Sequence, residues 1–220
     1  MVMNKKLLLL GGGGHCKSVI DSLAKTECYT EIGIIDKKQN IGKNILGFPI
    51  IGCDDDLLNL YQNGYYSAFI TVGSVGNPVI RVKLFKMLKN IGFEIPNIID
   101  PNAIVSEHVT LEEGIYVGKN AVINAGNFIE KCAIINTGSI VEHDCFIGQF
   151  SHISPGSVLC GEVQIGEYTH VGARSVVKQQ VKIGANTLIG MGSVVLKNIP
   201  ENVMAYGNPC KEVATLCTHI

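Results

Sequence analysis

Residues 139–166 read S-I-V-E-H-D-C-F-I-G-Q-F-S-H-I-S-P-G-S-V-L-C-G-E-V-Q-I-G, and an aliphatic residue returns at every sixth position. The same phase extends over residues 103–198, which divide into sixteen hexads without an insertion. The third residue of every hexad is Val, Leu or Ile, from Val105 to Val195. Because only roughly a fifth of residues in an average protein are of these types, the period is not accidental. It matches neither a helix nor simple strand alternation.

The hexads predict a parallel β-helix. Two residues before each aliphatic the chain mostly places Ala, Ser, Thr, Cys or Val, and Gly is frequent one residue after it. We interpret one hexad as one flat side, with an inward aliphatic, a small residue and a flexible turn position. Three sides make a coil of eighteen residues, so residues that far apart should lie directly above one another. A stack of ordinary hairpins would instead need turn signals about every 8–12 residues.

The segment before the repeat has a different pattern. We expect strands at 6–10, 32–35 and 68–72, and helices at 18–24 and 79–90. Strands that alternate with helices predict a small Rossmann-like parallel sheet. The predicted domains are therefore an α/β domain over residues 1–100, a β-helix over 101–200 and a closing segment over 201–220.

A glycine run, residues 11–14, separates the first strand from its helix. Glycines there let the backbone approach a phosphate at the helix amino terminus, and Asp36, at the end of the second strand, could receive ribose or uracil donors. The spacing fails G-x-G-x-x-G, because Cys16 stands where the third glycine belongs, which argues against a dehydrogenase. The run alone leaves open a tight turn that binds nothing.

Composition narrows the function further. With 18 basic and 19 acidic residues, the chain has no general electrostatic attraction to nucleic acid or to a membrane surface. Its eight cysteines form no C-x-x-C pair, which favours reduced thiols in the cytoplasm. The apolar run at 7–10 is too short for a signal peptide or a membrane span.

His143 is the candidate catalytic base. It stands two places past the inward Val141, where a side chain points out of the prism, and its ordinary pKa suits proton transfer near neutral pH. Position alone favours an ordinary surface histidine over a catalytic one. We expect no metal site, because tight ligand pairs are lacking and small positions such as Cys145 point into the coil.

Three segments carry a family resemblance. G-G-G-G-H-x-K-x-V-x-D at 11–21, the hexads, and A-Y-G-N-P-C-K at 205–211, with Cys210 where the family has alanine, resemble the hexapeptide-repeat bacterial sugar acetyltransferases. These enzymes modify UDP-bacillosamine precursors, GDP-perosamine or sialic acid. The resemblance implies a left-handed prism, a homotrimer with clefts between subunits, and acetyl-CoA as the acetyl donor.

The family motif E-H-D/E-C matches residues 142–145, which implies that His143 is the base and that Asp144 orients it. Gly161, one coil above, is implied as the donor to the oxyanion. The acetyl-CoA contacts implied by the family are His152, Gly161, Ala173 and Met191. His170 lies eighteen residues past His152 and stays open between a functional and a structural role.

In the nucleotide-sugar members of the family, the glycine loop and the carboxylate after the second strand hold the substrate. Carried over, this nominates Gly13, Gly14, His15, Asp36, Lys37 and Gly73. We therefore expect N-acetylation of a nucleotide-linked amino sugar of the UDP-4-amino-sugar or GDP-perosamine type. Sialic acid O-acetylation and a noncatalytic assembly scaffold remain alternatives. Serine acetyltransferase is disfavoured, because it has no glycine-loop domain.

Overall fold

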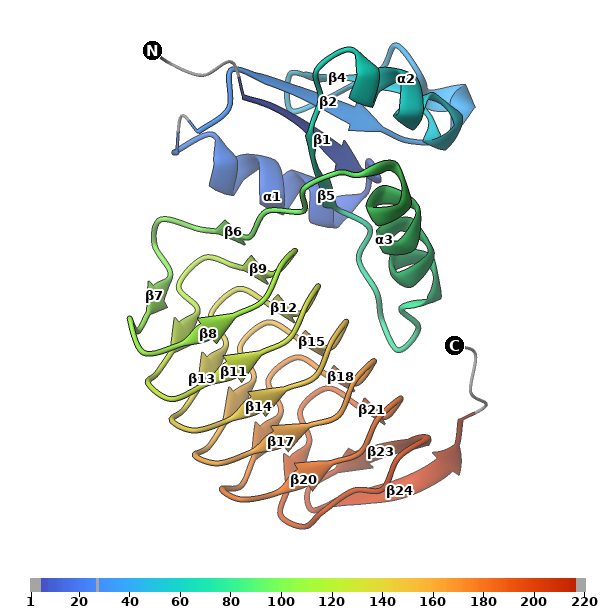
Figure 1. Cartoon of the computed structure of the whole chain (residues 1–220). Coiled ribbons are helices and arrows are strands. Elements are labelled where there is room, and N and C mark those ends of the chain that lie inside the picture. Colours follow the sequence, from blue (N-terminus) through green and yellow to red (C-terminus); the bar gives the residue numbers. More distant parts are fainter. Residues whose placement is uncertain (1–4, 27, 217–220) are drawn as a thin grey trace. The chain divides into compact units, whose positions relative to one another are not determined.

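The structure, a computed structural model, describes residues 5–26 and 28–216 and forms two compact units (Figure 1). The first contains the described residues up to Gly73 together with Ile80–Ile98, and the second contains Ser74–Val79 and the chain from Ile99 onward. The loop 74–79, which we had assigned to the amino-terminal domain, therefore groups with the repeat. It does so because the Ser74 carbonyl accepts a hydrogen bond from His152 and Gly76 packs on Leu188.

The first unit is an α/β domain around a five-stranded sheet in the order β3-β4-β2-β1-β5. Its elements are β1 (Lys6–Leu10), α1 (Gly14–Leu23), β2 (Glu31–Ile35), β3 (Asn44–Ile45), β4 (Phe48–Gly52), α2 (Leu57–Gln62), β5 (Ser67–Ile70) and α3 (Val79–Ile91), with short 3-10 turns η1 (Lys38–Asn40) and η2 (Asp54–Asp56). β1, β2, β4 and β5 are parallel, and β3 pairs antiparallel with β4. All four leucines of β1 are buried, as expected for a central parallel strand covered on both sides.

The predicted elements of this unit are present with shifted bounds, and β3, β4 and the short helix α2 are additional. α1 begins at Gly14, four residues earlier than predicted, because the glycine run itself supplies the helix start and Gly13 is the N-cap. Strands β3 and β4 were not predicted, since they are interrupted by Gly47 and Pro49. They extend the sheet beyond β2 and so enlarge its carboxyl edge.

The second unit is the predicted left-handed parallel β-helix, so the predicted fold class is confirmed. Its first face, the aliphatic face, consists of β7 (Ile104–Val105), β10 (Val122–Ile123), β13 (Ile140–Val141), β16 (Val158–Leu159), β19 (Val176–Val177) and β22 (Val194–Val195). The second, the mixed face, consists of β8 (Thr110–Leu111), β11 (Phe128–Ile129), β14 (Phe146–Ile147), β17 (Gln164–Ile165) and β20 (Lys182–Ile183). The third, the histidine face, consists of β6 (Ile98–Ile99), β9 (Tyr116–Val117), β12 (Ile134–Ile135), β15 (His152–Ile153), β18 (His170–Val171) and β21 (Leu188–Ile189), followed by β23 (Val203–Gly207) and β24 (Cys210–Thr215).

Stacked strands pair eighteen residues apart, as in Val141 with Leu159, and the second residue of each strand points inward. These aliphatic side chains, with the small residues before them, form one continuous buried core. The small residues are often hydroxyls that donate to the next coil, as Ser157 does to the Gly172 carbonyl at 2.9 Å. Burying a hydroxyl without such a partner would be costly, which explains why serine is tolerated inside the prism.

The turns correct one sequence interpretation. We had placed the flexible turn position at the glycine one residue after the inward aliphatic. From Gly114 to Gly192, the left-handed backbone occurs instead three residues after it, every sixth residue, at Asp144 and Glu162 among others. The glycine one residue after the aliphatic has another cause: a Cβ at Gly148 would come 2.5 Å from the backbone of Glu167 in the next coil.

Candidate active site

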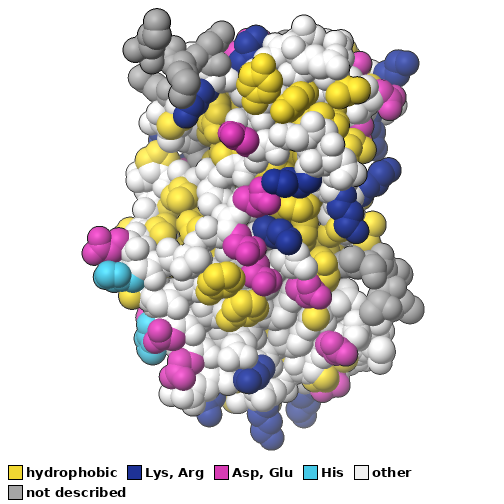
Figure 2. All heavy atoms as spheres, in the orientation of Figure 1, with side chains coloured by type: hydrophobic (Ala, Val, Ile, Leu, Met, Phe, Trp, Pro, Cys, Tyr) yellow, Lys and Arg dark blue, Asp and Glu magenta, His cyan; other side chains and the backbone are white. Residues whose placement is uncertain are grey.

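His143 lies in the turn between β13 and β14, on the edge where the aliphatic and mixed faces meet, which we call the catalytic edge. Its side chain is 58% exposed, and its Nδ1 lies 2.8 Å from Oδ2 of Asp144. Asp144 has a left-handed backbone, a conformation that Asp and Asn tolerate better than other side chains. On the face drawn in Figure 2, histidine side chains stand at the surface beside acidic ones.

The pKa of His143 is raised. The hydrogen bond that Nδ1–H donates to Asp144 is the main cause; desolvation, the next largest effect, opposes it, and the negative charges of Asp144, Glu142 and Glu162 reinforce it. Because the carboxylate accepts a hydrogen bond from Nδ1–H, the neutral ring carries its lone pair on Nε2. This is the arrangement of a general base held by an acidic partner.

Nε2 of His143 points at Gly161, one coil further along the same edge. A Cβ built at Gly161 would come 2.5 Å from Nε2 and 2.6 Å from Cε1, so any side chain there would displace the ring. The Gly161 N–H makes no hydrogen bond to any residue that the structure describes. The predicted base, its orienting carboxylate and the predicted oxyanion donor are thus brought together.

The other predicted acetyl-CoA contacts line a pocket elsewhere on the prism. A pocket of about 320 Å³ on the histidine face is lined by His152, Ala173 and Met191, together with Val75 of the loop after β5. Val75 and Met191 are 78% and 81% exposed. Leu188 and Ile189 add an apolar wall. Gly161, which we had also assigned to the donor, does not line this pocket and lies on the catalytic edge.

The hydrogen bonds of His152 define its tautomer. Oδ1 of Asn136 accepts from the Thr137 N–H at 2.8 Å, so the amide nitrogen of Asn136 is the atom that faces His152. That nitrogen lies 3.0 Å from Nε2, which must accept, and Nδ1–H therefore donates to the Ser74 carbonyl at 2.8 Å. His152 is a neutral ring with both nitrogens engaged.

His170 lies directly above His152, with the ring centroids 4.9 Å apart in an edge-to-face arrangement. It is 8% exposed, and burial lowers its pKa to about 4. Its Nε2 lies 3.2 Å from the Ser154 hydroxyl. These features favour the structural role, although the ring also lines the pocket.

The catalytic edge and the pocket beside His152, which we call the donor pocket, lie at opposite edges of the aliphatic face. His143 and Gly161 occupy turns that follow β13 and β16, whereas Ala173 and Met191 occupy turns that precede β19 and β22. A whole strand therefore separates them within one chain. A base on one copy and a donor pocket on another would meet if two aliphatic faces packed side by side.

All six predicted nucleotide contacts line one pocket of about 770 Å³ at the carboxyl edge of the sheet in the first unit. Within it, Asp36 Oδ2 accepts from the Gly12 N–H at 2.6 Å, and Oδ1 accepts from the N–H of Lys37 at 2.5 Å and from Asn40 at 3.1 Å. Burial would raise the pKa of Asp36, but these hydrogen bonds outweigh it and lower the pKa. The pocket thus has a carboxylate beside a glycine loop.

His15 stands at the first turn of α1 and lines the same pocket. Burial, and next the charge of Arg81, lower its pKa to about 4. A neutral His15 can donate to a phosphate or sugar oxygen without adding a charge.

Sequence analysis missed two contributors. Cys53, Asp54 and Asp55 line the nucleotide pocket because the unpredicted β4 ends beside β2. The available signal was the apolar run 48–52 followed by three acidic residues. Val75 lines the donor pocket through loop 74–79, and no local pattern points to it.

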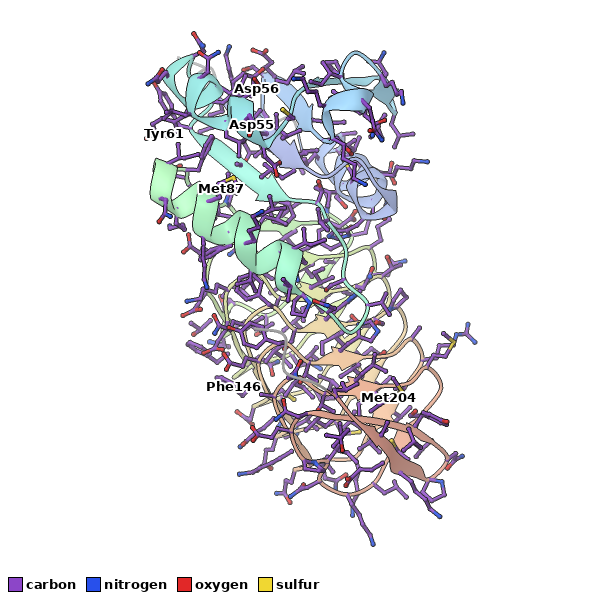
Figure 3. The ribbon with its side chains drawn as sticks, turned by 90° about the vertical axis from the view of Figure 1, so that its right-hand side faces the viewer. Asp55, Asp56, Tyr61, Met87, Phe146 and Met204 are labelled. Carbon is purple, nitrogen blue, oxygen red and sulfur yellow. The ribbon has the colours of Figure 1, made fainter. Side chains whose placement is uncertain are left out.

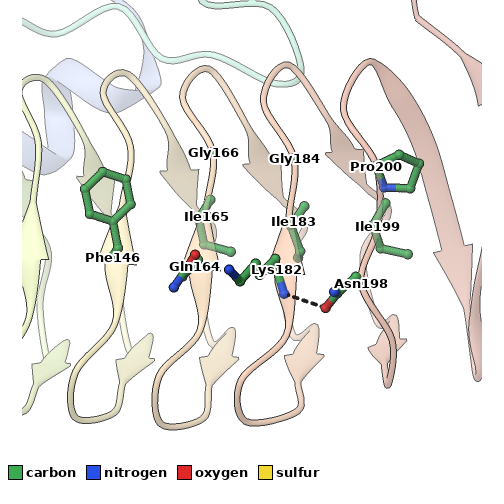
Figure 4. A pocket seen from close by; sticks show the side chains of 10 residues that line it. All are labelled: Phe146, Gln164, Ile165, Gly166, Lys182, Ile183, Gly184, Asn198, Ile199 and Pro200. Atoms are coloured by element: carbon green, nitrogen blue, oxygen red, sulfur yellow. Dashed lines mark hydrogen bonds between the residues drawn. The ribbon is translucent and has the colours of Figure 1, made fainter.

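A third pocket, of about 470 Å³, lies on the mixed face and is shown in Figure 4. It is lined by side chains of successive coils around Gly166 and Gly184, and there the Lys182 N–H donates to Oδ1 of Asn198 at 2.9 Å. None of the predicted site residues lines it.

Within residues 5–26 and 28–216, no three His, Cys, Asp or Glu side chains are grouped as metal ligands would be. Among the helices of that same part of the chain, none combines the length and apolar character needed to cross a bilayer.

Comparisons with known proteins agree with the division into an α/β domain and a hexapeptide-repeat prism. Residues 6–88 match the PglD N-terminal domain, and residues 144–179 and 162–197 match the bacterial transferase hexapeptide (six repeats) family. PerB from Caulobacter crescentus, solved with CoA and GDP-perosamine, is 38% identical over 95% of this chain and 97% of its own, with a TM-score of 0.89. A mutant of perosamine N-acetyltransferase from the same organism, with the same ligands, is 37% identical over the same shares, also with a TM-score of 0.89. The acetyltransferase domain of PglB from Neisseria gonorrhoeae, solved with acetyl coenzyme A, is 34% identical over 96% of this chain and all of its own, with a TM-score of 0.88.

Proposed function

We propose that the chain acetylates the amino group of a nucleotide-linked amino sugar, because it belongs to the CoA-dependent hexapeptide-repeat sugar N-acetyltransferases with a PglD-type amino-terminal domain. The observation that carries the proposal is the His143–Asp144 pair, with Nε2 of His143 directly beside Gly161. The nucleotide is proposed to lie in the glycine-loop pocket. The relatives PerB and PglB were solved with GDP-perosamine and acetyl coenzyme A respectively. These ligands support one site for a nucleotide sugar and another for acetyl-CoA.

His143 acts directly, without an acyl-enzyme. Bound acetyl-CoA supplies an activated carbonyl carbon as a thioester. Nε2 of His143 removes a proton from the amine as its nitrogen attacks that carbon, and the Gly161 N–H donates to the carbonyl oxygen as negative charge develops. His143 then returns the proton to the departing sulfur, so a C–N bond replaces the C–S bond. Asp144 keeps the ring oriented and stabilises its protonated form.

The donor pocket is proposed to hold the pantetheine arm of acetyl-CoA. Its apolar wall of Leu188 and Ile189 suits a flexible alkyl amide, and the exposed side chains of Met191 and Val75 can close over it. His152 has both ring nitrogens engaged, so we assign it to shaping the pocket and holding loop 74–79. This refines the donor contact expected from the family.

We propose that the enzyme is a homotrimer. The outward side chains of the aliphatic face are all β-branched and apolar: Ile104, Val122, Ile140, Val158, Val176 and Val194. The mixed face carries Thr110, Gln164 and Lys182 at corresponding positions. A continuous apolar column on a repeat protein favours burial against other copies. Packing these faces around a threefold axis would bring the catalytic edge of one copy to the donor pocket of the next.

A mixing experiment tests the shared site. His143→Asn removes the base, and Ala173→Arg blocks the donor pocket of the chain that carries it. Each variant alone should be inactive, whereas subunits unfolded and refolded together should recover a fraction of wild-type activity. Val158→Asp should dissociate the trimer in sedimentation, whereas Gln164→Asp on the mixed face should leave it intact. Mixed trimers that stay inactive would contradict the shared site.

The acceptor is tested by thiol release from acetyl-CoA with a panel of a UDP-4-amino sugar, GDP-perosamine and sialic acid. We expect release with a nucleotide-linked amino sugar and a product that carries an amide. Release with sialic acid alone would establish the O-acetyltransferase alternative. Thiol release with none of these acceptors, from a trimer that binds acetyl-CoA, would favour the scaffold.

We place the enzyme in the cytoplasm, where acetyl-CoA and nucleotide sugars are available. The seven cysteines that the structure describes are all free thiols, which is compatible with a reducing compartment. Alkylation of the protein in intact cells before and after lysis would test this location.

A further inference from the structure

The carboxyl edge of the α/β sheet defines a direction for a nucleotide sugar. Across it, the chain segments that follow the strands occur in the order β5, β1, β2, β4, and they contribute Gly73, the glycine loop, Asp36 and Cys53–Asp55 respectively. All four segments line the same pocket. A base, a ribose, a diphosphate and a sugar form a linear sequence that can lie along such an edge.

The positions of the diphosphate and of the ribose determine which way the nucleotide sugar lies. The diphosphate belongs at the amino terminus of α1, where Gly13 and Gly14 leave the backbone N–H groups open. Asp36, on the next strand, is placed to accept from the ribose hydroxyls. The sugar then lies on the other side of the diphosphate from the ribose, toward β5 and Gly73. The base therefore lies beyond β2, at the end of β4, roughly 10 Å from β1.

The end of β4 presents two uncommitted carboxylates. Asp56 caps η2, and its Oδ2 accepts from the Cys53 N–H at 2.8 Å. Asp54 and Asp55 line the pocket, and their carboxylates make no hydrogen bond or ion pair with residues that the structure describes. Figure 3 labels Asp55 and Asp56, neighbours on this turn.

A carboxylate only accepts hydrogen bonds, and it is strongest when it accepts two in parallel. Guanine offers two adjacent donors, N1–H and the N2 amino group, on its pairing edge. Uracil offers one N–H between two carbonyl oxygens, which a carboxylate would repel. Building on the proposed function, we propose that Asp54 and Asp55 recognise the base and that the substrate is a guanosine diphosphate sugar.

The test is calorimetric binding of GDP, IDP and UDP to the full-length protein. IDP is GDP without the N2 amino group, so it reports on that contact alone. We expect GDP to bind about tenfold more tightly than IDP, and more tightly again than UDP, because hydrogen bonds to charged groups are worth roughly a tenfold change or more. The double variant Asp54→Asn, Asp55→Asn should bind GDP and IDP alike. Asp36→Asn, the matched control, should weaken all three nucleotides by a similar factor.

Three results would overturn the inference. Equal binding of GDP and IDP by the wild type, or a preference for UDP, would refute guanine recognition while leaving the acetyl transfer intact. A GDP preference that survives the double variant would refute the assignment to Asp54 and Asp55. Binding of none of the nucleotides would refute the nucleotide pocket itself, and the inference with it.

Discussion

The prism places histidines in two contrasting regions. At the catalytic edge, His143 is exposed, paired with Asp144, and has a raised pKa. On the histidine face, His170 is buried and hydrogen-bonded to a serine hydroxyl, and its pKa is lowered to about 4. The same hexad repeat supports both, because a turn residue points to solvent while a strand residue lies against neighbouring side chains.

The location within the hexad governs what a histidine can do. A base must exchange a proton with substrate near neutral pH, which requires access and a carboxylate that stabilises the charged ring. His170 lacks that partner, and burial penalises its charged form.

The largest effect is expected at the catalytic edge. His143→Asn should lower kcat/KM by about a thousandfold, because general bases contribute in that range. Thiol release with a nucleotide-linked amino sugar measures it. His108→Asn is the matched control, since His108 is also an exposed turn histidine, next to Glu107, and it should keep full activity. A loss of less than tenfold in the His143 variant would contradict the role of His143 as the general base.

The second prediction concerns the buried region and stability. The unfolded chain protonates His170 below its ordinary pKa of 6.5, whereas the folded chain does so only near pH 4. Stability should therefore fall as the pH drops from 6.5 to 4, by roughly 3 kcal/mol at most from this residue. Denaturant unfolding of His170→Gln should show a weaker loss between pH 7 and pH 5 than the wild type. His15, also with a pKa of about 4, should maintain part of the slope.

The two regions also differ in how far sequence could predict them. Within the prism, residue number translates directly into position, so Gly161 could be placed beside His143 from an eighteen-residue offset. The bonding of His152 could not be predicted, because Ser74 reaches it from 78 positions away and no repeat relates the two. In the α/β domain, the short β4 and its Asp54–Asp55 end were missed because Gly and Pro obscure the strand pattern.

The third prediction concerns Asp144, the carboxylate partner that His143 has and His170 lacks. Since the hydrogen bond that His143 donates to Asp144 is the main cause of the raised pKa of His143, Asp144→Asn should lower that pKa. Activity requires the deprotonated ring, so the rise of kcat with pH should move to lower pH, while the plateau falls by about thirtyfold as the orienting partner is lost. The pH profile of kcat measures both. A plateau loss without the shift would indicate a purely structural role for Asp144.

The smallest effect is expected at His152, between the extremes in burial. Asn136→Ala removes the donor to Nε2 but leaves the Nδ1–H bond to Ser74, so KM for acetyl-CoA should rise only about threefold, with kcat nearly unchanged. Asn136→Asp should do more, because a carboxylate accepts from Nε2–H while Nδ1–H still donates to the Ser74 carbonyl, which favours the doubly protonated, charged ring. A positive charge would then stand at the wall of the donor pocket. Nitrogen NMR of the imidazole should show the neutral Nδ1–H tautomer in the wild type and the imidazolium in Asn136→Asp, and equal KM values for the two variants would show that the charge of His152 does not matter for donor binding.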